Sequence, residues 1–167
     1  PQIKHILMVE NKEKNNSTIS NRELSLRKEE LRNKVKGLIA CNIFNKKPLS
    51  IKKRFDILAS FYCADSIVSS KKEWENAMEN MFRLVKPGGW VILSALRNTI
   101  KYKVGNTYFP SANVNERDMH RVLLKNGFDS QTINVKIIPA FDWVKEGIKS
   151  LMILKARKKY GTHKKKN

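Results

Sequence analysis

The chain has 167 residues, 41% of them hydrophobic, and a formal net charge of +19. This length suits one domain with a buried core. No apolar run approaches the ~20 residues of a membrane span, and the start lacks the charged and apolar parts of a signal peptide. Cys41 and Cys63 show neither metal-ligand spacing nor a disulfide framework, and the three histidines are far apart. We therefore expect a cytoplasmic protein without a metal site.

The positive charge points only weakly to nucleic acid. Lysine greatly outnumbers arginine, the residue that best reads base edges. The last thirteen residues, "KARKKYGTHKKKN", carry seven positive charges and no acid. We expect a domain over residues 1–157 and a basic, disordered tail over 158–167. The charge permits contact with a polyanion without requiring it, so nucleic acid is not an expected partner.

The first third of the chain predicts a strand, a helix and a second strand. Residues 3–10 suit a short strand. Ser20, with Glu23 three positions later, forms a capping-box pattern that begins a helix, and Gly37 is suited to end it. The apolar stretch 37–44 predicts the next strand, which a basic loop follows.

The middle of the chain alternates strand, helix and strand. Residues 55–63, "FDILASFYC", predict a strand buried on both faces. Residues 73–85 have helical spacing, and a Pro-Gly-Gly sequence at 87–89 predicts a tight turn before a strand over 90–96. The apolar face of the helix, which we interpret as core, consists of Trp74, Ala77, Met78, Met81, Leu84 and Val85.

The last third predicts a loop, a helix and two strands. Residues 97–114 are polar and aromatic and predict a long loop. Asn115 caps a helix with Asp118 at its third position. Strands over 130–140 and 148–156 have only a seven-residue link, so we expect an antiparallel pair at one edge. The alternation as a whole predicts an α/β fold with a mostly parallel sheet.

Ligands of open α/β sheets lie off the carboxyl ends of strands. An acid there can hold both hydroxyls of a ribose through its two oxygens. Where an amide is followed by an aliphatic residue, the amide can hydrogen-bond to an adenine ring and the aliphatic side chain can cover the face of that ring. Each candidate can equally be a solvated polar strand end. The candidates, in chain order, are Glu10, Asn15, Asn42, Ile43, Phe61, Asp65 and Tyr102.

Taken together, these features resemble a class I S-adenosylmethionine-dependent methyltransferase with a Rossmann-like sheet. More narrowly, the chain resembles the nicotinamide, phenylethanolamine and indolethylamine N-methyltransferases. The resemblance implies methyl transfer from S-adenosylmethionine to a small amine or a pyridine-type nitrogen. It spans roughly positions 3 to 157 and rests on "RKEELRNKVKGLIACNIFNKKPL", "FDILASFYCADSI", "LVKPGGWVILSAL", "YKVGNTYFP" and "VKIIPA".

The resemblance implies five cofactor-binding residues. Glu10 matches the acid that binds the ribose hydroxyls, and Asn15 matches an asparagine of the same site. Asn42 and Ile43 match the pair that holds the adenine, although the family often has aspartate where this chain has Asn42. Phe61 falls where a backbone contact to the cofactor is made.

Two residues match the family's substrate pocket. Asp65 matches an acidic position near the amine, where it can orient the amine or accept its proton. The alternative for Asp65 is an acid favoured by a helix N-terminus. Tyr102 matches an aromatic residue of that pocket, and Thr99 stands where the phenylethanolamine enzyme has an acid. We interpret Cys63 as a small core side chain rather than a nucleophile.

The chain departs from the family in one important respect. The family's glycine-rich cofactor turn has no counterpart here, and the chain begins where the family's second strand begins. We therefore expect the first strand of the sheet to be missing, with a partner chain or an N-terminal segment completing it. One hypothesis is an N-methyltransferase present in part. The other is a catalytically inactive fragment that acts as a binding module, for instance for a polyanion.

Overall fold

The computed structural model describes residues 20–160. The predicted strand over 3–10 and the candidate residues Glu10 and Asn15 lie outside the described residues. The chain divides into two compact units, Pro1–Ile39 and Ala40–Asn167.

Helix α2, Asn21–Lys34, belongs to the first unit. The Ser20 side chain accepts a hydrogen bond from the Glu23 backbone N–H at 3.1 Å, so the predicted cap is confirmed. No residue of α2 is buried. The helix ends at Lys34, before the predicted end at Gly37. Val35 is its C-cap, because the Val35 N–H donates to the carbonyl of Arg32.

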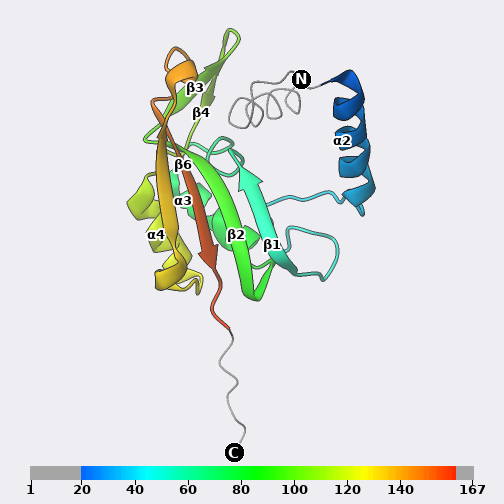
Figure 1. Ribbon diagram of the computed structural model, residues 1–167. Helices are drawn as coiled ribbons and strands as arrows, with labels where there is room; N and C mark the ends of the chain where they lie inside the picture. Colours follow the sequence, from blue (N-terminus) through cyan, green and yellow to red (C-terminus); the bar gives the residue numbers. More distant parts are fainter. Residues whose placement is uncertain (1–19, 161–167) are drawn as a thin grey trace, which may run out of the picture. The chain divides into compact units, whose positions relative to one another are not determined.

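The second unit contains all six described strands and the remaining helices (Figure 1). None of the described helices is long and apolar enough to cross a membrane. The elements, in chain order, are β1 (Phe55–Phe61), α3 (Lys71–Phe82), β2 (Val85–Arg97), β3 (Lys101–Val104), β4 (Thr107–Pro110), α4 (Glu116–Lys125), η1 (Ser130–Thr132), β5 (Asn134–Pro139), η2 (Phe141–Trp143) and β6 (Ser150–Arg157).

Four strands form a mixed sheet in the order β1-β2-β6-β5. Strands β1 and β2 are parallel, whereas β6 is antiparallel to both of its neighbours, β2 and β5. The predicted antiparallel pair of the last two strands, with β5 at the edge, is confirmed. These directions make β5 run the same way as β1 and β2, so three carboxyl ends meet at one edge of the sheet.

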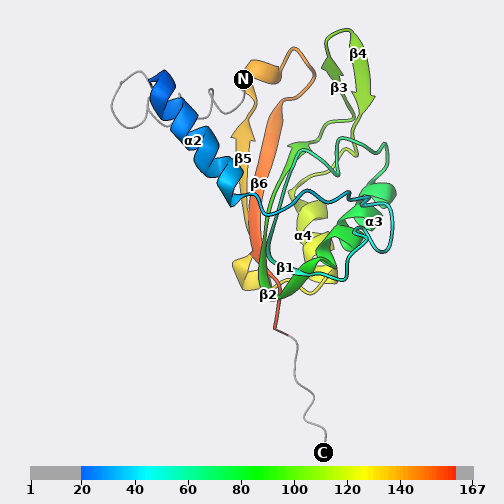
Figure 2. The same cartoon turned by 90° about the vertical axis from the view of Figure 1, so that its right-hand side faces the viewer.

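Helices α3 and α4 lie side by side on one face of the sheet (Figure 2). Their apolar faces form the core with alternate residues of β2 and β6. Trp74, Ala77, Met78 and Met81 of the predicted helix face are all buried. The capping box of α4 is also present: Asn115 accepts from Asp118, whose carboxylate accepts from the Asn115 N–H.

The Pro-Gly-Gly sequence at 87–89 is not the predicted turn, because it lies inside β2. Helix α3 ends at Phe82, and β2 begins at Val85. The pairing of β1 with β2 then shifts, since Phe55 faces Val85 but Ile57 faces Trp90. The extra residues form a bulge. Gly89 is required there because a Cβ at this position would lie 2.8 Å from the carbonyl oxygen of Asp56.

Two further predictions need correction. The apolar stretch 37–44 is not a strand; it has only a single bridge, between Cys41 and Leu49. Its backbone groups bond within the loop, as when the Asn42 N–H donates to the carbonyl of Pro48. The predicted loop over 97–114 contains the β3–β4 hairpin, whose two-residue Gly-Asn turn matches a known hairpin signature.

Candidate functional site

A pocket of about 450 Å³ lies where the carboxyl ends of β1, β2 and β5 meet the β3–β4 hairpin. Its walls come from the residues after β1, the end of β2, the hairpin and the segment between β5 and β6. The lining residues are Tyr62, Ser66, Leu96, Tyr102, Lys103, Val104, Gly105, Trp143, Glu146 and Ile148.

Specific contacts join the walls of this pocket. The Tyr102 hydroxyl donates to the carbonyl of Ser66 at 3.2 Å, which ties the hairpin to the segment after β1. The Lys103 N–H donates to the carbonyl of Glu146 at 2.9 Å, which ties the hairpin to the segment before β6. The rings of Tyr62 and Trp143 meet edge to face, with centroids 6.2 Å apart. Three aromatic rings are thus fixed around one cavity.

Glu146 supplies an acid to this largely apolar cavity. Its Oε2 atom is buried and has no hydrogen-bond partner within the described part of the chain. A buried carboxylate oxygen without a donor is costly. Since aromatic rings of the same cavity also attract cations, the lining suits a positively charged group that carries N–H donors.

Asp65 lies behind the pocket wall rather than on it. Its side chain is 1% exposed, and Oδ2 accepts from the Leu96 N–H at 2.8 Å and from the Ser66 hydroxyl at 3.3 Å. Both partners line the pocket. Burial raises the pKa of Asp65 although these hydrogen bonds oppose the rise. No helix begins at Asp65, because α3 starts at Lys71, so the alternative of a helix N-terminal acid is wrong.

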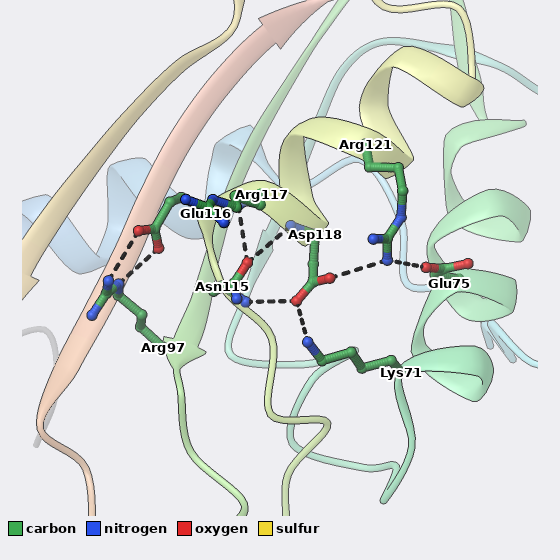
Figure 3. Close-up of polar contacts among 8 residues, drawn as sticks. All are labelled: Lys71, Glu75, Arg97, Asn115, Glu116, Arg117, Asp118 and Arg121. Carbon is green, nitrogen blue, oxygen red and sulfur yellow. Dashed lines mark hydrogen bonds and ion pairs between the residues drawn. The ribbon is translucent and has the colours of Figure 1, made fainter.

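The pocket end of β2 is also held from the side of α4 (Figure 3). Arg97 follows Leu96 and makes two hydrogen bonds to the Glu116 carboxylate, at 2.8 and 2.9 Å. These bonds lower the pKa of Glu116 to about 2. Asp118 meanwhile accepts from Lys71 at 2.6 Å, which joins α4 to the start of α3. The end of β2 at Leu96 is therefore held by Asp65 through the Leu96 N–H and by Glu116 through the neighbouring Arg97.

Of the cofactor candidates within the described residues, Phe61 lies at the carboxyl end of β1, whereas Asn42 and Ile43 lie in the loop that precedes this strand. Phe61 ends that strand and is 56% exposed. Asn42 is exposed, and its Oδ1 accepts from the Phe44 N–H at 3.0 Å, which leaves its amide N–H groups for a ligand. Ile43 is buried in the core, and its carbonyl accepts from the side chain of Asn80 at 2.9 Å.

Cys63 is exposed, so its interpretation as a core side chain is wrong. It follows Tyr62, whose positive φ of 51° turns the chain outward after β1. Although the side chain is exposed overall, partial burial of the thiol raises its pKa, and so do the charges of Asp65 and Cys41.

Of the predicted substrate residues, only Tyr102 lines the pocket, while Asp65 supports its wall from behind. Thr99 is buried, and its hydroxyl donates to the carbonyl of Arg97. Glu146 and Trp143 were not among the predicted site residues. The sequence feature that could have identified them is the link "FDWVKEG", because it follows β5 at the same edge of the sheet as the carboxyl ends of β1 and β2.

Comparison with known families gives a match over almost the whole chain. The model of the NNMT/PNMT/TEMT family matches residues 1–159. Phenylethanolamine N-methyltransferases of Macaca mulatta and Homo sapiens are each 22% identical to the chain over 115 residues. Those segments cover 66% of this chain and 41% of each relative, so the chain matches less than half the length of these relatives.

Solved structures share the fold. A methyltransferase from Methanosarcina mazei that depends on S-adenosylmethionine has a TM-score of 0.57 and 16% identity, covering 85% of this chain and 80% of that one. The N-methyltransferase NodS from Bradyrhizobium japonicum, solved with S-adenosyl-L-homocysteine, has a TM-score of 0.52 and 12% identity, covering 83% and 63%. The fold is therefore the Rossmann-like fold of class I methyltransferases.

Proposed function

The chain belongs to the NNMT/PNMT/TEMT family, and on that premise we propose that its aromatic pocket binds the acceptor of an S-adenosylmethionine-dependent N-methyl transfer. The acceptor class is a small amine or a pyridine-type nitrogen. The single observation that carries the proposal is that Glu146, whose Oε2 is buried and unpartnered within the described residues, lines the same cavity as the rings of Tyr62 and Trp143. This arrangement favours an amine, which is a cation with N–H donors at neutral pH.

The residues of the pocket have separate tasks in this proposal. Glu146 binds the ammonium group and accepts the proton that nitrogen must lose before its lone pair can attack. Tyr62, Tyr102 and Trp143 hold the apolar part of the substrate and exclude water. Asp65 is a positioning residue, because it acts through the Leu96 N–H and the Ser66 hydroxyl rather than through the pocket.

S-adenosylmethionine, when bound, supplies the methyl group of its sulfonium. Asn42 fits such a ligand because its amide N–H groups are exposed and free within the described residues, and Phe61 fits because it ends a parallel strand at its carboxyl edge. Ile43 supports this segment from the core rather than from the surface. Glu10 and Asn15 complete the proposed set, as the family resemblance implies.

One edge of β1 has no neighbouring strand within the described residues. Ile57 and Phe61 on this strand are 61% and 56% exposed. Free backbone groups beside exposed apolar side chains suit a further strand. A segment that precedes this chain in a longer protein, or a partner chain, is proposed to supply it and complete the sheet.

The test is calorimetric titration of the chain with phenylethylamine and, separately, with nicotinamide. The Glu146→Gln variant is expected to bind phenylethylamine at least tenfold more weakly, because it loses a buried charge-assisted hydrogen bond. The affinity for nicotinamide, whose ring carries no ammonium group, should fall less in this variant. Asp142→Asn is the matched control, since Asp142 is an exposed acid of the same segment outside the pocket.

Equal phenylethylamine binding by Glu146→Gln and the unaltered chain would contradict the role of Glu146. Titration with S-adenosyl-L-homocysteine tests the cofactor part of the proposal separately. Binding that Glu10→Ala abolishes would support the cofactor site. Amine binding without any heat from S-adenosyl-L-homocysteine would support the inactive fragment, with the acceptor pocket formed and the cofactor site incomplete.

A further inference from the structure

The end of the sheet opposite the pocket is strongly basic. Three segments lie together there: 52–56 before and in β1, 84–90 at the start of β2, and 155–160 at the end of β6. We call them the basic surface. It carries eight cationic residues and one acid: Lys52, Lys53, Arg54, Lys86, Lys155, Arg157, Lys158 and Lys159 against Asp56.

Backbone contacts fix these segments against one another. The Gly88 N–H donates to the carbonyl of Lys158 at 3.0 Å, and the Lys158 N–H donates to the carbonyl of Gly89 at 2.8 Å. The Phe55 N–H donates to the carbonyl of Leu84 at 2.7 Å. The cations are therefore brought together by the fold, although their segments are about 30 and 70 residues apart in the sequence.

Little of this charge is neutralised within the described residues. Asp56 is the acid of the basic surface, and both of its oxygens lie 2.9 Å from Nζ of Lys86. Lys158 is half-buried, and its Nζ donates to the carbonyl of Phe82 at 2.7 Å; burial and the neighbouring charge of Arg54 lower its pKa. Lys52 and Lys53 are exposed. Several like charges held close together favour a polyanionic ligand.

An exposed aromatic ring lies within the same surface. Tyr160 is 66% exposed, and the Arg157 guanidinium lies 4.9 Å from the centroid of its ring. The same guanidinium lies 5.8 Å from the ring of Trp90 and donates to the carbonyl of Gly88, so its position is fixed. Aromatic rings among cations provide stacking platforms for unpaired bases.

We propose that the basic surface binds single-stranded nucleic acid, with Lys52, Lys53 and Lys159 on the phosphates and Tyr160 stacked on a base. This site lies at the end of the sheet away from the amine pocket, so it is independent of the proposed methyl transfer. The basic surface carries eight of the 34 lysine and arginine residues of the chain, which the fold brings together from three segments.

The experiment measures fluorescence anisotropy of a labelled 20-nucleotide oligouridine titrated with the chain. If the three lysines neutralise three phosphates, log K falls against log salt with a slope of about −2, so affinity drops about 20-fold between 50 and 200 mM salt. The variant with Lys52→Gln, Lys53→Gln and Lys159→Gln should bind at least tenfold more weakly at 50 mM salt, with a shallower slope.

The matched control is the variant with Lys72→Gln, Lys145→Gln and Lys149→Gln, three exposed lysines elsewhere with the same total change of charge. It should bind almost as well as the unaltered chain. Equal losses in the two triple variants would overturn the proposal, because binding would then follow net charge alone.

Tyr160→Ala tests the aromatic part, with an expected loss of about tenfold at constant salt dependence. Vesicles with phosphatidylserine serve as the competing polyanion. Selective loss of vesicle binding in the first triple variant, with oligouridine binding unchanged, would overturn the proposal in favour of a membrane surface. Failure of amine binding would leave the result for oligouridine unaffected, since the two sites share no residue.

Discussion

Replacement of Glu116 by glutamine tests how the pocket end of β2 is held. Glu116 begins α4 and accepts two hydrogen bonds from Arg97, at 2.8 and 2.9 Å (Figure 3). The pKa of Glu116 falls from 4.5 to about 2. Unscreened, that shift corresponds to about 3 kcal/mol. Because the Glu116 side chain is 38% exposed and that of Arg97 is 27% exposed, we expect about 1 kcal/mol after screening.

The dependence on pH follows from the direction of the shift. The folded state binds the Glu116 proton less tightly than the unfolded state, so the stabilisation is fully present above the unfolded pKa of about 4.5. It is lost as the pH falls toward about 2. Urea unfolding followed by circular dichroism should therefore show a gap of about 1 kcal/mol between the unaltered chain and Glu116→Gln at pH 7. The gap should close near pH 2.

A gap of the same size at both pH values would refute this reasoning, because the effect could not then come from ionisation. Glu79→Gln is the matched control. Glu79 pairs with Arg83 one helical turn away at 2.9 Å, through a single hydrogen bond and with the Arg83 side chain 49% exposed. Such a pair contributes about 0.3–0.5 kcal/mol. A double-mutant cycle with Arg97→Met separates the pair from the favourable effect of an acid at a helix N-terminus.

Variants at Gly89, Asn115 and Asp65 test the fold around the sites by the same unfolding measurement. Gly89→Ala should cost about 1–3 kcal/mol, because its Cβ would press on the Asp56 carbonyl, whereas Gly37→Ala, with open space around it, should be nearly neutral. Asn115→Ala should cost about 1 kcal/mol through loss of the α4 cap, and a change below 0.3 kcal/mol would contradict that role. Because burial raises the pKa of Asp65 above its ordinary 3.8, the contribution of the protonated acid is fully present below pH 3.8 and is lost as the pH rises through the folded pKa. Asp65→Asn should therefore be better tolerated at pH 8 than at pH 3.5. Asp65→Ala should be worse than Asp65→Asn at either pH.

Local chemistry explains which elements could be predicted from the sequence. The cap of α4 at Asn115 depends on residues three positions apart, and the buried face of α3 depends on helical spacing. The short link between β5 and β6 limits that pair to an antiparallel arrangement. Each of these features is decided within a few residues of the chain.

The features that sequence analysis missed depend on distant partners. The bulge at Gly89 exists because the pairing of β1 with β2 changes register, and no sequence pattern within β2 predicts that register. The stretch 37–44 has the composition of a strand but no neighbouring strand within the described residues, so its backbone bonds in local turns. Asp65 has the residue type of a catalytic acid, but only the position of the Leu96 N–H identifies it as a support.

Trp143 and Glu146 could not be predicted as site residues because β5 was expected to form an antiparallel pair rather than to end beside the parallel strands. Strand β5 is antiparallel to its neighbour β6, yet two reversals make it run in the same direction as β1 and β2. Its carboxyl end therefore delivers Trp143 and Glu146 to the pocket that Tyr62 and Leu96 approach from the other strands. The acceptor pocket depends on the β2–β6–β5 side of the sheet, whereas the proposed cofactor contacts depend on the side of β1 that has no described neighbour. The two halves of the proposed reaction thus rest on separate parts of the sheet, which is why binding of the amine and of the cofactor can be tested one at a time.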